Sequence, residues 1–183
     1  MSPTQLPSGL VDYVESAGIA LTLADARDPE HPLILVNEPF LKLSGRKRDE
    51  VIGRNCRFLQ GDRRDQEGLE KVRRFLASEE IGTIRVQLVN LRADGTPFIN
   101  MLTLSRICDP ENETCYLFAS QFDIGAADAA DAEDYEDELG RTRQYARDML
   151  KPVGMQLMGS RAALADAALT IAQARIQLSR YAD

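Results

Sequence analysis

The chain of 183 residues is acidic, with a formal net charge of −7 and a pI of about 4.9. Because duplex-DNA-binding proteins usually carry a basic face, this charge balance argues against nucleic acid as a partner. No apolar run approaches the roughly 18 residues that a membrane-spanning helix needs, and residues 1–18 lack the basic and apolar segments of a secretory signal. We therefore expect a cytoplasmic protein with no membrane partner.

Cysteine and histidine are too few for several common kinds of site. The three cysteines, an odd number, argue against a disulfide framework. His31, the single histidine of the sequence, lies in a proline-flanked turn, and no motif supports a zinc site or a catalytic triad built on it. We expect no metal site and no enzymatic activity.

The N-terminal half of the chain predicts short elements. Residues 8–17 can form an amphipathic helix, and residues 19–25 and 33–36 have the apolar pattern of strands. Between residues 38 and 60, several short helical pieces are separated by glycines. Residues 65–78 predict one longer helix, whose apolar side is formed by Leu69, Val72, Phe75 and Leu76.

Three strands follow in the second half. Residues 83–91 and 97–107 predict two strands joined by a turn that contains Asp94-Gly95, a strong hairpin signal. Residues 115–123 predict the third strand. Sequential hairpins with helices inserted between the second and third strands favour an antiparallel α+β sheet over a parallel one.

The last third of the chain predicts helices. Residues 126–150 begin with an alanine-rich, acidic stretch, which suits the N-terminal end of a helix. Pro152 and Gly154 end this helix, and residues 155–180 predict a second one with an apolar stripe.

Residues 53–61 contain the motif with the clearest chemical meaning. They read Gly-Arg-Asn-Cys-Arg-Phe-Leu-Gln-Gly, a string that resembles the signature of LOV (light-oxygen-voltage) domains, the flavin-binding branch of the PAS superfamily. The resemblance covers about residues 19–123 and implies the PAS/LOV fold, a five-stranded antiparallel sheet with helices on one face. It divides the chain into an N-terminal cap helix (1–18), a LOV domain (19–124) and a two-helix C-terminal extension (125–183).

The resemblance also implies a cofactor and a reaction. LOV domains bind FMN noncovalently and form a reversible bond between a cysteine thiol and flavin carbon C4a in blue light, so Cys56 is expected to be the reactive residue. Gln121 is expected to reach flavin N5 and O4 and to rotate its amide when N5 becomes a hydrogen-bond donor. The other cofactor-binding residues that the resemblance implies are Phe40 near the flavin ring, Asn90 and Asn100 at its pyrimidine edge, and Asn55, Arg57, Gln60 and Arg73 along the ribityl chain and phosphate.

Strand parity supports part of this site without the resemblance. Side chains alternate between the two faces of a strand, and the neighbours that share a face with Asn90, Asn100 and Gln121 are almost all apolar. An apolar box with three amide groups suits a buried flavin, whose pyrimidine edge offers both donors and acceptors. Arginine suits a phosphate. Thr22 is placed to face the flavin where the family often has an apolar residue.

Plainer roles stay open for several of these residues. An isolated buried cysteine is usually only part of a core, Arg73 could belong to a solvated helix face, and Asn90 and Asn100 could flank turns. For the whole chain, the alternatives are a light-independent flavin redox sensor, a PAS interaction module with another ligand, and a light-gated enzyme domain.

The C-terminal extension is expected to transmit the signal. The other face of the sheet, which includes Ile99, Met101, Tyr116 and Phe118, is too apolar to be left in water. The helix predicted at 155–180 could cover it within one chain, or two chains could bury these surfaces in a homodimer. We expect light to change the packing of the C-terminal helices, and with it dimerisation or the binding of a downstream protein.

Overall fold

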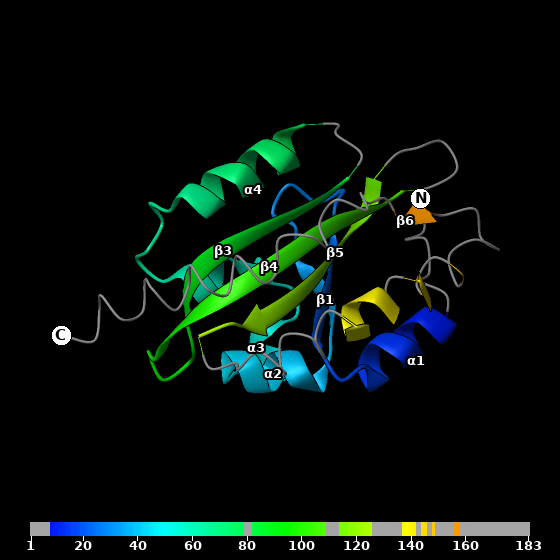
Figure 1. The fold of residues 1–183 in the computed structure, drawn as a ribbon, viewed down its shortest axis with the longest axis horizontal. Coiled ribbons are helices and arrows are strands. Elements are labelled where there is room, and N and C mark those ends of the chain that lie inside the picture. Colours follow the sequence, from blue (N-terminus) through cyan, green and yellow to red (C-terminus); the bar gives the residue numbers. More distant parts are fainter. Residues whose placement is uncertain are drawn as a thin grey trace.

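In the part of the chain that the structure describes, five antiparallel strands lie side by side in the main sheet (Figure 1). This computed structural model describes residues 8–78, 82–108, 114–125, 137–141, 144–145, 148 and 156–157. The strand order β2-β1-β5-β4-β3 confirms the predicted antiparallel α+β fold. The strands are β1 (Ala20–Asp25), β2 (Leu33–Val36), β3 (Thr83–Leu91), β4 (Pro97–Cys108) and β5 (Thr114–Asp123).

The β3–β4 hairpin turns at the predicted Asp94-Gly95 pair. Gly95 has a φ of +84°, a left-handed conformation that glycine adopts without a steric penalty. The Asp94 carboxylate accepts a hydrogen bond from the Thr96 amide at 2.9 Å, and the two strands pair from Leu91 opposite Pro97 onward. This register decides which side chains of β3 and β4 share a face of the sheet.

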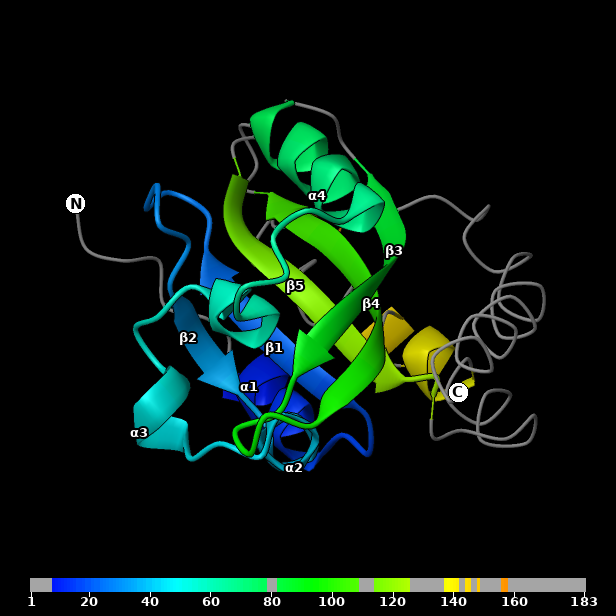
Figure 2. The ribbon, with the colours of Figure 1, turned by 90° about the vertical axis from the view of Figure 1, so that its left-hand side faces the viewer.

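Four short helices lie on one side of the sheet, which we call the inner face (Figure 2). Their apolar side chains form one core cluster with inward-facing residues of the strands, and this cluster contains Phe40, Val51, Leu59 and Phe75. The helical pieces predicted within 38–60 and the helix predicted at 65–78 are confirmed. The helices are α2 (Glu38–Ser44), α3 (Arg48–Val51), the 3₁₀ helix η1 (Cys56–Gln60) and α4 (Glu67–Ala77).

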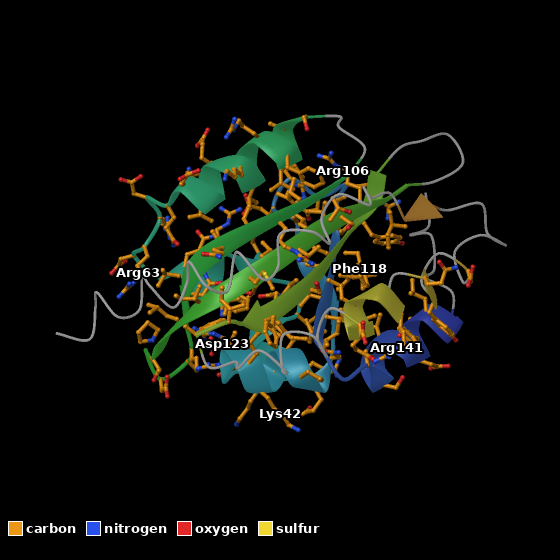
Figure 3. The ribbon with its side chains drawn as sticks, viewed as in Figure 1. Lys42, Arg63, Arg106, Phe118, Asp123 and Arg141 are labelled. Carbon is orange, nitrogen blue, oxygen red and sulfur yellow. The ribbon has the colours of Figure 1, made fainter. Side chains whose placement is uncertain are left out.

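Arg106 of β4 donates hydrogen bonds to the carbonyl groups at the C-terminal end of α4 (Figure 3). Its guanidinium is buried, and Nη2 donates hydrogen bonds to the carbonyl oxygens of Phe75, Leu76 (3.3 Å) and Ser78 (2.7 Å). The same guanidinium lies 4.2 Å from the centroid of the Phe75 ring. Because the last carbonyls of a helix have no partner inside the helix, Arg106 fixes α4 on the inner face.

The opposite side of the sheet, the outer face, is covered by α1 (Ser8–Ser16) and by a helical segment at residues 137–141. The cluster around α1 contains Leu10, Val14, Leu21, Leu23, Ile107, Tyr116 and Phe118. The cluster around Leu139 contains Ile99, Met101 and Ile124. We predicted that a helix at 155–180 or a second chain would cover this face. Instead, α1 and Leu139 of the same chain bury most of it, and a second chain is not needed for that purpose.

The helix predicted at 155–180 is wrong at its beginning. Gln156 and Leu157 form a short strand, β6 (Gln156–Leu157), that pairs antiparallel with Ile107 and Cys108 of β4. On this side of β4, β3 extends only to the level of Ser105, so the backbone groups beyond it are open to another strand. Pairing at an open sheet edge outweighs a weak local helix propensity. The rest of the predicted helix lies outside the described residues.

Other predictions for the extension are described in part. Residues 137–141 are helical, as predicted for 126–150, whereas residues 126–136 lie outside the described part of the chain. The side chains of Cys108 and Cys115 lie outside it as well. Within the residues that are described, no helix is long and apolar enough to cross a membrane.

One fully buried amide connects the helices of the two faces. Asn37, the N-cap residue of α2, accepts hydrogen bonds on Oδ1 from the backbone amides of Phe40 (3.2 Å) and Leu21 (3.0 Å). Its Nδ2 donates to the carbonyl oxygens of Val14 (3.0 Å) and Ile19 (2.8 Å). Since Val14 lies in the last turn of α1, this side chain satisfies the end of one helix and the start of the next.

Candidate functional site

A cavity lies between the inner face of the sheet and the helices η1 and α4. Leucine and alanine side chains form most of its walls, and its polar groups come from β1, β3, β4, β5, η1 and the loops. The strands contribute Thr22, Ala24, Leu33, Leu88, Asn90, Asn100, Leu102, Leu104, Leu117, Ala119 and Gln121. The helices and loops contribute His31, Asn55, Cys56, Arg57, Leu59, Gln60, Leu69, Val72 and Leu76. Five of the apolar residues predicted by strand parity to face inward are among these, namely Leu88, Leu102, Leu104, Leu117 and Ala119.

Three buried amides form a row across the sheet. Asn100 Nδ2 donates hydrogen bonds to Asn90 Oδ1 and to Gln121 Oε1, each at 2.9 Å. Asn100 lies on β4 between the other two strands, where its direct partners are Leu88 and Asp123. Asn90 and Gln121 each lie two residues along their strand from these partners, so both are diagonal neighbours of Asn100 on the same face. Diagonal side chains on one face are close enough for such contacts, so the antiparallel register assembles the row.

Two polar atoms of this row have no partner among the described residues. Asn100 Oδ1 and Gln121 Nε2 are buried and make no hydrogen bond there. A buried polar atom without a partner is costly, typically about 1–3 kcal/mol, and native structures rarely keep one without a reason. One acceptor and one donor left free beside an apolar cavity indicate a planar polar ligand with groups of both kinds.

Cys56 is the first residue of η1 and lines the same cavity. Asn55, the N-cap residue, accepts a hydrogen bond from the Arg57 amide at 2.9 Å and so holds the start of η1. Burial raises the pKa of the Cys56 thiol from 9.0 to about 12, against a smaller lowering by the neighbouring Gln121 side chain. The thiol therefore keeps its proton at neutral pH and is a weak nucleophile in the resting protein.

A cluster of polar residues marks one end of the cavity. Asn55, Arg57 and Gln60 all line it. Arg57 forms an ion pair with Glu30 at 2.9 Å, and Asn55 Nδ2 donates to the Glu30 carbonyl oxygen. Because both ends of the ion pair are largely exposed, this contact is weak, and the guanidinium is available to an anion.

Two of the residues expected at the cofactor lie elsewhere. Phe40 is fully buried in the apolar cluster against which Cys56 packs, but it does not line the cavity. Arg73 is exposed on α4, where it pairs with Glu70 at 3.3 Å and donates to the Arg64 carbonyl oxygen at 3.1 Å. The structure thus brings Asn55, Cys56, Arg57, Gln60, Asn90, Asn100 and Gln121 together, and leaves Phe40 and Arg73 off the cavity wall.

The fold agrees with a comparison to known proteins. The model of the PAS domain family matches residues 18–126. This chain belongs to the PAS family. A solved LOV protein of Rhodobacter sphaeroides is 28% identical and superposes with a TM-score of 0.67, over 95% of this chain and 94% of that one. Within the PAS family, the chain is therefore a LOV protein.

Two curated relatives of this LOV protein are bacterial light receptors. Blue-light-activated histidine kinase 1 of Erythrobacter litoralis is 36% identical over 124 residues, which are 68% of this chain and 33% of the kinase. The blue-light photoreceptor of Listeria monocytogenes is 34% identical over 140 residues, 76% of this chain and 51% of the relative. The LOV protein thus matches about a third to a half of the length of these relatives, and they support a blue-light sensor.

Sequence reasoning missed one polar residue of the cavity in this LOV protein. His31 lines it, in a loop where its φ of +46° is unusual for a residue other than glycine. The prolines on either side predict the turn, but nothing in the sequence indicates the direction of the imidazole. Thr22 lines the cavity, as expected from its position on the first strand.

Proposed function

We propose that this LOV protein senses blue light through FMN bound noncovalently in the cavity, with Cys56 as its reactive thiol. The observation that carries the proposal is the buried row of three amides. Its free acceptor on Asn100 and free donor on Gln121 lie on the wall of an apolar cavity that Cys56 also lines. A flavin ring is flat and apolar with a polar pyrimidine edge, and it would satisfy both atoms.

Each polar residue has a defined task in this proposal. Asn90 and Asn100 hydrogen-bond the pyrimidine edge, because an amide can both donate and accept. Asn55, Gln60 and Arg57 hold the ribityl chain and phosphate, with Arg73 joining them if it leaves Glu70. Arginine pairs with phosphate in a planar fork, which is why FMN is proposed over a flavin without a phosphate.

Cys56 and Gln121 carry the response to light. The bound flavin supplies light absorption and a reactive excited state. On illumination, the Cys56 thiol would give its proton to flavin N5 while Sγ bonds to carbon C4a, so that the flavin C4a=N5 double bond becomes a single bond. Gln121 then exchanges the amide end that it presents to flavin N5, from the Nε2 donor to the Oε1 acceptor. Because Asn100 Nδ2 donates to Gln121 Oε1, this rotation also breaks a contact between β4 and β5. In the dark, the S–C4a bond would break and the proton would return to Sγ.

An absorption spectrum before and after a blue flash tests the proposal. Purified wild type should be yellow, bleach on illumination and recover in the dark, and Cys56→Ala should be yellow without forming the bleached state. If Cys56→Ala also keeps its biological response, the light-independent flavin redox sensor is the better description. A colourless wild type that takes up no added flavin would leave a PAS interaction module with another ligand.

For the output, we propose a cytoplasmic signalling protein without an active site of its own. Its N-terminal cap helix (1–18) and C-terminal extension (125–183) respond to the LOV domain (19–124). Because α1 and Leu139 already bury most of the outer face, we propose that the apolar stripe in the sequence of 155–180 binds a surface other than its own sheet. A second copy of the chain or a downstream protein would give it a partner, and we propose a homodimer.

Light and dark size-exclusion profiles of the full chain test the homodimer. An elution volume that shifts between the two states supports a light-dependent dimer, and two identical monomer profiles contradict it. Fractionation of the source cells tests the proposed location, and an assay for autophosphorylation tests the proposed lack of kinase activity.

A further inference from the structure

The edge strand β3 is covered by the chain that connects η1 to α4. In the described part of the sheet, β3 is the last strand on its side, and edge N–H and C=O groups need partners. Gln66, the N-cap residue of α4, supplies both for Val89: its Oε1 accepts from Val89 N at 2.7 Å, and its Nε2 donates to Val89 O at 3.0 Å. We call this pair of hydrogen bonds the Gln66 clamp. One side-chain amide replaces a neighbouring strand at Val89.

Two glycines allow the connecting segment to lie close to β3. A Cβ atom on Gly68 would overlap the carbonyl oxygen of Gln87. A Cβ atom on Gly61 would lie 2.7 Å from Leu91 Cδ1, and Gly61 also has a φ of +52°. Between Gly61 and Gly68 of α4, the chain therefore runs close to β3 at every second residue, Leu91, Val89 and Gln87, and the Gln66 clamp bonds it to the strand at the middle one.

The clamp adjoins the polar wall of the cavity. Asn90 follows Val89 and lines the cavity, and Asn90 Nδ2 donates to the same Val89 carbonyl oxygen at 3.3 Å. On the other side of the cavity, Cys56 and Gln60 belong to η1, which is separated from Gln66 by only a short loop. The Val89 peptide therefore controls the direction of the Asn90 amide, and the clamp sets the spacing between β3 and η1.

We propose that Gln66 is a positioning residue for the flavin. Gln66 does not itself line the cavity, and it acts through the Val89 peptide and the Asn90 amide. Val89 O now accepts from both Gln66 Nε2 and, at the longer distance of 3.3 Å, Asn90 Nδ2. When the clamp is lost, the Asn90 donor is left with this carbonyl to itself, and the tighter hydrogen bond between them turns that amide away from the pyrimidine edge. This inference rests on the proposed function, because it assigns a role towards the flavin of that same cavity.

Substitutions at Gln66 in the full chain test the inference against a matched helix control. Gln66→Ala removes both hydrogen bonds, and Gln66→Glu keeps the acceptor for Val89 N–H but loses the donor. Lys71→Gly is the control, since Lys71 is exposed on α4 and glycine weakens the helix without touching β3. The readouts are the rate of FMN dissociation, the infrared band of the flavin C2=O group, and hydrogen exchange at the Val89 amide in the flavin-free chain.

The expected pattern separates positioning from stability. Gln66→Ala should release FMN about tenfold faster, shift the C2=O band and expose the Val89 amide to exchange. Gln66→Glu should keep the Val89 amide protected and still shift the band. Lys71→Gly should change neither the band nor the release rate.

Two results would overturn the inference while the proposed function stands. One is a Gln66→Ala variant with the wild-type band and release rate despite faster exchange at Val89. The other is a Lys71→Gly control that shifts the band as much as Gln66→Ala does. A wild type that binds no flavin would overturn the proposed function, and this inference with it.

Discussion

Tyr13 of α1 stacks on Tyr145 of the C-terminal extension, with ring centroids 4.0 Å apart and planes inclined by 19°. Figure 1 shows α1 beside the helical segment that begins at residue 137. The two elements also pack on the outer face of the sheet, where α1 buries Leu10 and the segment at 137–141 buries Leu139. The helix that precedes the sheet and the segment that follows it are therefore in direct contact, and a displacement of one of them would alter the packing of the other.

Tyr13→Ala should loosen this contact. A stacked aromatic pair contributes about 1 kcal/mol beyond the area it buries, so the free energy of unfolding should fall by roughly that amount. Hydrogen exchange at residues 137–141 should increase, and the control Tyr13→Phe, which keeps the ring, should behave as wild type. An unchanged exchange rate at 137–141 in Tyr13→Ala would show that the stack does not hold the extension.

Asn37→Asp should separate the two tasks of Asn37. The carboxylate can still accept from the amides of Phe40 and Leu21, but it cannot donate to the carbonyls of Val14 and Ile19 and it repels them. We expect α1 to exchange its amide hydrogens faster while α2 stays protected, and stability to fall by about 2 kcal/mol or more. Asn37→Ala is the reference, and it should expose the first turn of α2 as well. Equal protection of α1 in all three proteins would contradict the role of Asn37 at the α1 end.

Much of the sheet and the amide row follow from local sequence. Asp94-Gly95 predicts the hairpin because its turn needs a residue with a positive φ, which Gly95 adopts without a steric penalty. Period-2 alternation then places Asn90, Asn100 and Gln121 on one face. These features depend on neighbours in sequence or on one hairpin, and that is why the sequence alone predicts them.

Other features depend on contacts that sequence spacing does not encode. Arg106 has the parity of an inward-facing residue, but a charged side chain in a strand normally indicates an exposed position, and only the end of α4 explains its burial. Gln66 falls at the start of the helix predicted at 65–78, and that pattern does not indicate that its side chain contacts Val89 on another element. Gln156 and Leu157 have helix propensity that the open edge of β4 outweighs. Each of these is a case in which a tertiary partner decides the outcome.

Arg106→Met should destabilise the protein by about 2–4 kcal/mol, because carbonyls at the end of α4 lose their donor while staying buried. Arg106→Lys keeps a charge but has no planar fork to reach several carbonyls, so its loss should be intermediate. Urea denaturation of the flavin-free chain measures both. Denaturation midpoints that equal the wild-type value would show that water replaces the guanidinium at no cost.

The Cys56 thiol gives the protein a pH dependence in the alkaline range. Burial, against a smaller opposing effect of the neighbouring Gln121 side chain, raises the pKa of Cys56 from 9.0 to about 12. In the unfolded chain this thiol ionises near the lower value, so between the two values the folded state binds more protons than the unfolded state. The stability that the protonated thiol contributes is complete below the lower value and is lost as the pH rises towards the higher one, by at most about 1.4 kcal/mol per pH unit.

Comparison of wild type with Cys56→Ala isolates this effect, because the other alkaline groups titrate in both proteins. In the flavin-free chain, wild-type stability should fall faster than that of Cys56→Ala above the unfolded pKa, while at neutral pH the two should follow parallel curves. Denaturation in urea at several pH values provides the measurement. Curves that stay parallel throughout the alkaline range would mean that the folded thiol ionises at its ordinary pKa. Cys56 would then carry a thiolate fraction in the dark, and the protein would have no need of light to make its sulfur reactive.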